Sequence, residues 1–276
     1  MPRRISTVRG REFGAGVRAA LDQTGMSYRA VARLVGWDFA KLSDLLNGKG
    51  GISELDLSRL LGVCRTPLPE CKHLHELYRL ASEEGWWQIY DGTLPIQLRT
   101  LIEHEDAAKA LISWHLTVVP GLLQTAEYIR AQVAVWPSIL PKDIEPRVAA
   151  RVARQQILES DRKFTFYIHE YALHLPVGGH DVWIAQLHHL LRMLVRPNII
   201  LRVVPAAIGA HAGSTGEFCM LKFEKIEPVV YLDSLNSSLF LEDKASREIY
   251  TKVLEALDQV ALGQEQSRRL ITDIIS

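Results

Sequence analysis

The chain has 276 residues, of which 47% are hydrophobic and 23% charged, and its formal net charge is zero. This ordinary globular composition excludes a disordered or fibrous protein, and a prior of about 150 residues per domain predicts two domains. No apolar run reaches the ~20 residues that a membrane-spanning helix needs, so we expect a cytoplasmic protein. The three cysteines form no Cys-x-x-Cys pair, which predicts neither a disulfide framework nor a structural zinc site.

A local basic excess lies at the start of the chain. Residues 1–35 hold seven arginines against Glu12 and Asp22, a local net charge of +5, whereas the whole chain balances 32 basic against 32 acidic residues. Affinity for DNA comes from neutralising phosphates with a local basic surface, so the local excess matters more than the total. The N-terminal region is therefore the expected DNA-binding region.

Short helices are predicted in this region. Residues 11–24 predict a first helix. Ser27 is placed to cap a second helix and Asp38 a third. A fourth helix begins after Ser53, and Asp56 three residues later makes a weaker version of the capping box. Four or five such helices predict a small closed bundle.

The stretch 25–48 reads as a helix-turn-helix, because two short amphipathic helices are broken at Gly36. The apolar faces of the two helices are Val31, Leu34 and Val35 on the first, and Leu42, Leu45 and Leu46 on the second. Packing across such a corner presents the second helix outward, where it can enter a DNA major groove.

Polar and aromatic residues on the outer face of this second helix are the candidates for DNA contact. Those opposite its leucines are candidates for contact with base edges: Phe39, Ala40, Lys41 and Asp44. Residues at helix N-termini and flanking cations are candidates for phosphate contact: Ser27, Tyr28, Arg29, Lys41 and Lys49. The alternative for each of these residues is an ordinary solvent-exposed side chain that makes no contact with DNA.

The clearest break in the chain is Thr66-Pro67-Leu68-Pro69, because two prolines in three residues cannot continue a helix. We therefore expect a helix-turn-helix domain over 1–66, a linker helix with a Trp-Trp segment over 67–97, and a C-terminal domain over 98–276. The helix of the linker is expected over 70–84.

The C-terminal domain is predicted to be α+β with a small antiparallel sheet. Helical patterns cover about 98–115, 124–135, 142–160, 181–195, 240–262 and 265–275. Alternating or β-branched runs predict strands over 164–168, 199–204, 217–223 and 229–232. The last two strands read as an antiparallel hairpin with a five-residue loop.

Several residues of this domain are candidates for binding a ligand or partner. The aromatic pair Trp86 and Trp87, with other tryptophans of the chain, could line a pocket, although core packing is the ordinary alternative. A buried ionic network or partner anchor could be built from Glu103, Arg151, Arg154 and Glu170. His211 lies in a Gly-rich loop and could line a cavity.

Catalysis and metal binding are not expected. His169 and His174 are five residues apart and would diverge by about 140° on a helix, whereas a zinc pair needs one helical turn. The sequence carries no Gly-x-Ser-x-Gly elbow and no Cys-His signature. We expect no enzyme activity, no cofactor and no metal.

Residues 1–66 resemble the Cro/CI-type (XRE) helix-turn-helix family. In that family a Lys-hydrophobic-Ser motif is followed by a glycine, and here these are Lys41-Leu42-Ser43 and Gly48. The rest is similar to the C-terminal domain found with this helix-turn-helix in many actinobacterial regulators. The words that carry this second resemblance are Gly85-Trp86-Trp87, Glu103 with Ala107, Pro120-Gly121-Leu122-Leu123-Gln124-Thr125, Glu127-Tyr128, Arg151-x-x-Arg154-Gln155, Glu170 with Leu173, Gln186-Leu187, Pro205, Gly216-x-Phe218 and Val230-Tyr231.

The resemblance implies a lambda-repressor-like all-α N-terminal domain and a dimeric transcriptional regulator whose C-terminal domain receives a ligand or small protein partner. Some relatives look like the antitoxin half of paired systems. Three departures matter: Tyr28 stands where the family often has a phosphate-binding Gln, Asp44 replaces a residue that is frequently basic, and Leu46 replaces one that is frequently Glu. We expect a sequence-specific regulator of double-stranded DNA; the alternative is an antitoxin-like adaptor with weak or vestigial DNA binding.

Overall fold

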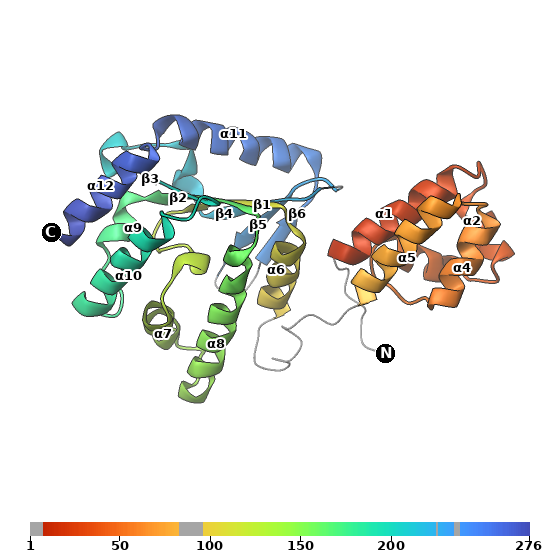
Figure 1. Ribbon diagram of the computed structural model, residues 1–276, viewed down its shortest axis with the longest axis horizontal. Coiled ribbons are helices and arrows are strands. Elements are labelled where there is room, and N and C mark those ends of the chain that lie inside the picture. The colour runs from red at the N-terminus through yellow and green to blue at the C-terminus, as the bar shows by residue number, and fades with distance from the viewer. Residues whose placement is uncertain (1–7, 83–95, 225, 235–237) are drawn as a thin grey trace. The chain divides into compact units, whose positions relative to one another are not determined.

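The computed structural model describes residues 8–82, 96–224, 226–234 and 238–276, and the chain divides into two compact units, Met1–Gln88 and Ile89–Ser276 (Figure 1). The described part of the first unit is helical. Its helices are α1 (Val8–Asp22), α2 (Tyr28–Leu34), α3 (Phe39–Leu46), α4 (Glu54–Val63) and α5 (Leu68–Ser82).

The first helix begins at Val8 rather than at residue 11, whereas the predicted starts of the second, third and fourth helices are confirmed. The Ser27 side chain accepts a hydrogen bond from the Ala30 amide, and the Asp38 carboxylate accepts one from the Lys41 amide at 2.7 Å. Ser53 and Asp56 form a complete capping box at the start of α4. Each side chain satisfies an amide that the first helical turn leaves without a partner, which fixes where the helix begins.

The corner between α2 and α3 is also as predicted, since Gly36 has a φ of +73°. Leu34, however, is 61% exposed, so it does not share the buried face of α2 with Val31 and Val35. Helical spacing alone does not show which of the neighbours Leu34 and Val35 is buried, because both lie at the edge of the apolar face of the helix. In the structure the chain turns at Gly36 and Leu34 stays outside that face.

Helix α5 packs in the core of the first unit. Leu74 and Leu77 lie in the same apolar cluster as Phe13 of α1, and the rings of Phe13 and Tyr78 meet edge to face with centroids 5.7 Å apart. The helix that we expected to begin at residue 70 as a linker therefore begins at Leu68 and completes this unit. Pro69 lies in its first turn, where a proline costs no helical hydrogen bond.

The second unit contains one sheet, and its described elements follow in chain order. They are α6 (Ile96–Ala107), β1 (Ala110–His115), α7 (Ala126–Ala134), α8 (Ile144–Arg154), β2 (Lys163–His169), α9 (Glu170–His174), α10 (His180–Met193), β3 (Ile199–Val204), β4 (Phe218–Lys222), β5 (Val229–Asp233), β6 (Ser238–Leu241), α11 (Lys244–Val260) and α12 (Gln264–Ile275). Short 3-10 turns connect several of them, among them Gly121–Leu123.

The sheet corrects the predicted fold. It has six strands in the order β3-β2-β1-β4-β5-β6, with β1, β2 and β3 parallel and the remaining pairs antiparallel, so it is larger than expected and mixed. The predicted hairpin of β4 and β5 is confirmed. Strand β1 falls inside the helix predicted over 98–115, and β6 overlaps the start of the one predicted over 240–262. Short apolar runs fit both periodicities, so their pattern does not distinguish strand from helix.

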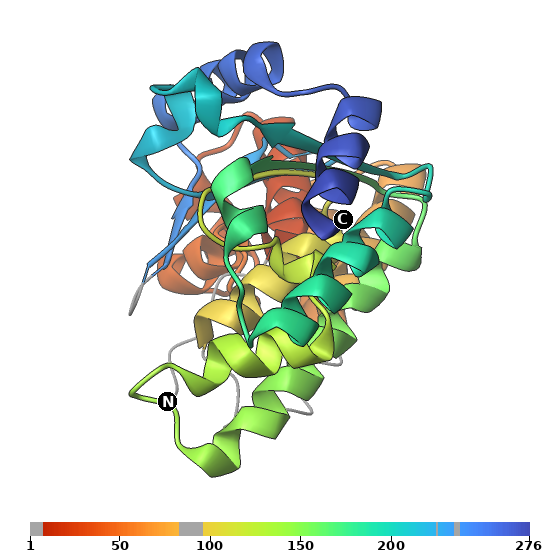
Figure 2. The ribbon, with the colours of Figure 1, turned by 90° about the vertical axis from the view of Figure 1, so that its left-hand side faces the viewer.

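Helices cover both faces of the sheet (Figures 1 and 2). Leu254 and Leu257 of α11 pack against Trp114 and Phe218 on one face. The opposite face forms the larger core, to which α6, α7, α10 and α12 contribute buried residues. No helix within the described residues is long and apolar enough to cross a membrane.

Candidate functional site

The first candidate surface is the outer face of α3. Leu42, Leu45 and Leu46 are buried in the first unit, which leaves the N-terminal end of the helix facing solvent. There Phe39 is 44% exposed and Ala40 is exposed. The guanidinium of Arg29 on α2 lies 5.4 Å from the Phe39 ring centroid, a cation–π distance. An apolar ring and a cation are thus presented together.

Lys41 is held by its own domain. Its ammonium lies 3.0 Å from the Asp56 carboxylate and 4.6 Å from the Trp37 ring centroid. The hydrogen bond from Lys41, with that from the Ser53 amide, lowers the pKa of Asp56. A DNA contact by Lys41 therefore has to compete with a partly buried ion pair.

Asp44 is balanced by a neighbouring cation. The Lys49 ammonium lies 3.1 Å from its carboxylate, and both side chains are well exposed. A paired carboxylate repels phosphates less than an isolated one because the two charges offset each other at a distance. Asp44 and Lys49, expected as separate base and phosphate contacts, are therefore one charge pair at the end of α3.

The hydroxyl of Tyr28 donates to the Asp22 carboxylate at 2.6 Å, and this hydrogen bond raises the pKa of Tyr28. Its single O–H is committed there and cannot also donate to a phosphate. The Ser27 hydroxyl accepts from the α2 backbone. Among the phosphate candidates, Arg29 is thus the cation that no carboxylate in the described part of the chain pairs with. Arg33, which was not among the predicted phosphate contacts, is also exposed on α2 and follows Arg29 by one helical turn.

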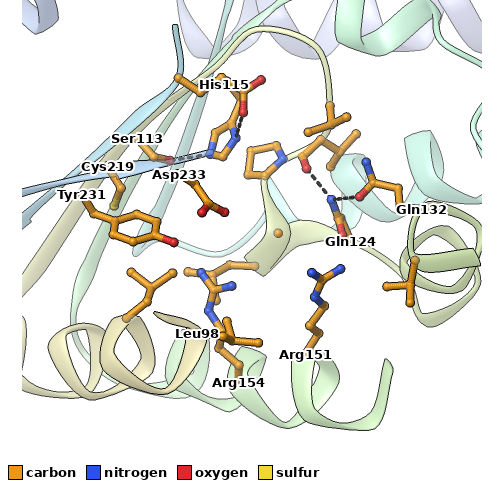
Figure 3. Close-up of a pocket in the computed structure, with 18 of the residues that line it drawn as sticks. Leu98, Ser113, His115, Gln124, Gln132, Arg151, Arg154, Cys219, Tyr231 and Asp233 are labelled. Carbon is orange, nitrogen blue, oxygen red and sulfur yellow. Dashed lines mark hydrogen bonds and ion pairs between the residues drawn. The ribbon is translucent and has the colours of Figure 1, made fainter. Parts of the chain in front are cut away.

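The second candidate site is a cavity of about 670 Å³ in the C-terminal unit. It opens between the carboxyl-terminal part of β1, the strands β4 and β5, the helix α8 and the segment 117–124 (Figure 3). Its apolar lining comes from Leu98, Leu101, Val119, Leu122, Val133, Trp136, Ile139, Phe166 and Phe218. A cavity of roughly 300–1,000 Å³ suits a small organic ligand.

One wall carries a buried ion pair. The Arg154 guanidinium binds the Glu105 carboxylate through two hydrogen bonds of 2.6 Å, and Glu105 is only 2% exposed. Among the described residues the expected network of Glu103, Arg151, Arg154 and Glu170 is not seen: Arg154 pairs instead with Glu105. Helical spacing could have found Glu105, since Leu98, Leu101 and Glu105 fall on one face of α6.

Two other predicted candidates lie elsewhere. The Glu170 carboxylate accepts from the Ala206 amide at 2.7 Å, and the His211 ring stacks on His169 with centroids 5.4 Å apart. Neither residue lines the cavity. Burial lowers the pKa of both histidines, so they are predominantly neutral near pH 7. Trp86 and Trp87 lie outside the described residues.

Arg147, Arg151 and Arg154 follow one another at i, i+4 and i+7, so all three project from one side of α8 into the cavity. Figure 3 shows Arg151 and Arg154 reaching from α8 toward the side of Asp233 and Gln124. No hydrogen bond or ion pair joins Arg147 or Arg151 to any described residue, and the Nε atom of Arg147 is buried. Arg151 and Arg154 were predicted as candidates from the sequence, whereas Arg147, which the same helical spacing indicates, was not.

The opposite wall of the cavity carries the carboxylates of Glu217 and Asp233, and neighbouring groups already bind Glu217. Burial raises the pKa of Glu217, but the His115 imidazole and the amides of Thr117 and Leu116 outweigh it and lower the pKa to about 2. The Glu217 carboxylate lies 3.6 Å from His115 Nδ1 and accepts from the Leu116 amide at 2.8 Å. Asp233 is the remaining carboxylate of the lining.

The same wall holds a serine beside a histidine. His115 Nε2 lies 3.0 Å from the Ser113 hydroxyl, so Ser113, His115 and Glu217 follow the order of a hydrolytic triad. Ser113, however, lies within β1, whose residues pair with β2 on one side and β4 on the other. Amides paired in this way are not free to stabilise an oxyanion. Burial also raises the pKa of the Cys219 thiol, which keeps it protonated. The geometry serves binding better than covalent catalysis.

The packing of α2 and α3 and the exposed end of α3 define a helix-turn-helix protein of the class that binds DNA. Residues 12–74 match the family model described as Helix-turn-helix domain, and residues 98–273 match the one described as Domain of unknown function (DUF5753). The second match covers more than half of the chain, which therefore belongs to that family. No curated protein and no solved structure matches the chain significantly.

Proposed function

We propose that this protein is a sequence-specific transcriptional regulator of the Cro/CI type. Two copies, joined through their C-terminal domains, would place their α3 helices in successive major grooves about 34 Å apart, as dimeric helix-turn-helix proteins do. A ligand or small protein bound by the C-terminal domain changes that spacing and so the affinity for DNA. A cytoplasmic location fits this role.

The observation that supports this proposal most directly is the exposed N-terminal end of α3. Phe39 and Ala40 face solvent there although the rest of the helix is anchored by three buried leucines. Arg29 adds a cation beside Phe39. An apolar surface next to a cation suits contact with a thymine methyl and the adjoining phosphate.

The test is genome-wide mapping of bound DNA with the full-length protein, repeated for Phe39→Ala and Lys41→Ala. We expect discrete sites for the wild type, loss of those sites for Phe39→Ala, and affinity that falls steeply with salt in a direct titration. Undetectable or salt-independent binding to every site tested would contradict the proposal.

A second candidate function is an antitoxin-like adaptor that binds a small protein partner and touches DNA weakly. The ion pairs of Lys41 with Asp56 and of Lys49 with Asp44 favour it, because they occupy both lysines near α3. Co-purification with the product of a neighbouring gene, unchanged by nuclease, would support this function. The two roles are compatible in a regulator that controls its own partner.

A further inference from the structure

The cavity of the C-terminal unit combines an apolar lining with two arginines, Arg147 and Arg151, that form no hydrogen bond or ion pair with any described residue. Arg154 is compensated by Glu105, and Glu217 is compensated by His115 and two backbone amides. Arg147 and Arg151 lack an ion-pair partner among the described residues. Asp233 is the one carboxylate of the described lining left to offset them.

The unpaired arginine charges destabilise the folded protein when no ligand is bound. Burial lowers the pKa of the Arg151 guanidinium, and the charges of Arg154 and Arg147 lower it further; Asp233 and Tyr231 act in the opposite direction but do not outweigh them. A charge withdrawn from water without a paired counter-charge destabilises the folded state. Such a cation in a cavity is expected where an anion from outside completes the site.

The position of the arginines suits an anionic head group on an apolar body. They lie at i and i+4 on α8, so both guanidinium groups can bind one oxyanion, and planar guanidinium groups bind oxyanions through paired hydrogen bonds. Val133, Trp136 and Ile139 lie on the same lining and can contact an apolar body. Gln124 is less available, because its amide already donates to the Val119 carbonyl and to Gln132.

We propose that this cavity binds a small organic anion, with an oxyanion head on Arg147 and Arg151 and an apolar body against the hydrophobic lining. This inference depends on the proposed function in one respect: it takes the bound anion to be the signal that the regulator receives. The binding itself is a property of the cavity and can be measured without DNA.

The experiment uses two fluorescent probes with the full-length protein. The first, 8-anilinonaphthalene-1-sulfonate, has an aromatic body and a sulfonate; the second, N-phenyl-1-naphthylamine, has the same body without the charge. We expect both probes to bind saturably to the wild type. Arg151→Gln should weaken the binding of the anionic probe more than that of the neutral probe. Loss of a charge-assisted hydrogen bond should weaken its binding by about tenfold or more, with little change for the neutral probe.

Arg268→Gln is the matched control, because it removes an equal charge from an exposed site on α12 and should change neither probe. Arg147→Gln is a second variant in case Arg151→Gln folds poorly, and thermal unfolding of each variant shows whether it is folded. The proposal is overturned if folded Arg147→Gln and Arg151→Gln bind the anionic probe as the wild type does, or if both probes weaken equally.

Displacement of the anionic probe then distinguishes the head groups. We compare 1-naphthoate, 1-naphthyl phosphate and 1-naphthol, which share one ring system and differ in charge. Displacement by either anion but not by the alcohol supports the proposal and shows whether carboxylate or phosphate is preferred; equal displacement by the alcohol overturns it. These binding measurements contain no DNA. Failure of the DNA-binding test would therefore not affect them, and failure of the probe experiment would not affect the proposed regulator function.

Discussion

The Lys41 ammonium on α3 lies 3.0 Å from the Asp56 carboxylate at the start of α4. Asp56 also accepts from the Ser53 amide, so a single carboxylate caps one helix and restrains a side chain of another. This relationship links helix stability to the charge that α3 can offer to DNA.

Asp56→Asn should free Lys41 and remove one negative charge. We expect DNA affinity at low salt to rise by about two- to fivefold, the scale of a surface ion pair, while the free energy of unfolding falls by about 1 kcal/mol. Fluorescence anisotropy and urea unfolding measure the two effects. Ser53→Ala is the matched control: it removes the other half of the capping box and should destabilise the protein without raising DNA affinity.

Phe39→Ala should reduce sequence discrimination. Removal of an apolar base contact is expected to cost roughly 1 kcal/mol or more of specific binding, with little effect on binding to a scrambled duplex. The measurement is the ratio of the two affinities at one salt concentration. Leu55→Ala truncates an exposed apolar residue on α4 and should leave the ratio unchanged. An equal loss on both duplexes would assign Phe39 to folding rather than readout.

Arg29→Ala should weaken binding to all duplexes alike. If Arg29 neutralises one phosphate, the slope of log affinity against log salt should become shallower by about 0.9. Titrations between low and moderate salt give the slope directly. Arg268→Ala removes an arginine from the other unit and should not change it. An unaltered slope for Arg29→Ala would place that side chain away from the phosphate backbone.

Glu105→Gln should strongly destabilise the C-terminal unit, because it leaves the Arg154 guanidinium buried without its counter-charge. We expect a loss of about 3–5 kcal/mol in the free energy of unfolding, measured by urea. Glu145→Gln breaks the exposed ion pair with Arg130, which is also bidentate, and should cost far less, because solvent screens both charges. The double variant Glu105→Leu, Arg154→Met should recover much of the loss. Equal costs for the buried and exposed pairs would contradict the account.

Glu217 should contribute to stability against acid. Its pKa falls from an ordinary value of 4.5 to about 2 in the folded protein, so the folded state favours the carboxylate. The contribution is complete above the unfolded pKa and is lost as the pH falls from about 4.5 toward 2. Unfolding free energies across this range should decline less for Glu217→Gln than for the wild type. Parallel curves would show that Glu217 is not responsible; Glu127→Gln, an exposed change on α7, controls for the lost charge.

The N-terminal helices were predictable because their signals are local. Ser27, Asp38 and Ser53 each cap the helix expected of them, and Gly36 makes the expected corner. These features depend on a few neighbouring residues, which the sequence displays directly. The role of α5 is not local, since it depends on Leu74 reaching Gly16 on α1, where an added Cβ would lie 2.6 Å from the leucine.

The sheet and the cavity were harder to predict because they depend on distant partners. Strand β1 is recognisable only beside β2 and β4, which supply its ladder from positions far along the chain. Likewise the pairing of Arg154 with Glu105 rather than Glu103 depends on which side of α6 faces α8. Arg147 and Arg151 are visible in the sequence as a helical repeat, but their lack of counter-charges emerges only when the lining is assembled.

Two glycines allow the end of α3 to pack closely against α1. A Cβ at Gly14 would lie 2.7 Å from the Leu46 carbonyl oxygen, and one at Gly48 would lie 2.6 Å from the Arg11 amide, so the backbones at the end of α3 and in α1 nearly touch. Such contact leaves little room for α3 to tilt within its bundle. The helix-turn-helix domain is therefore rigid, and in the regulator proposed above a signal would have to change the spacing between two such domains rather than the shape of either one.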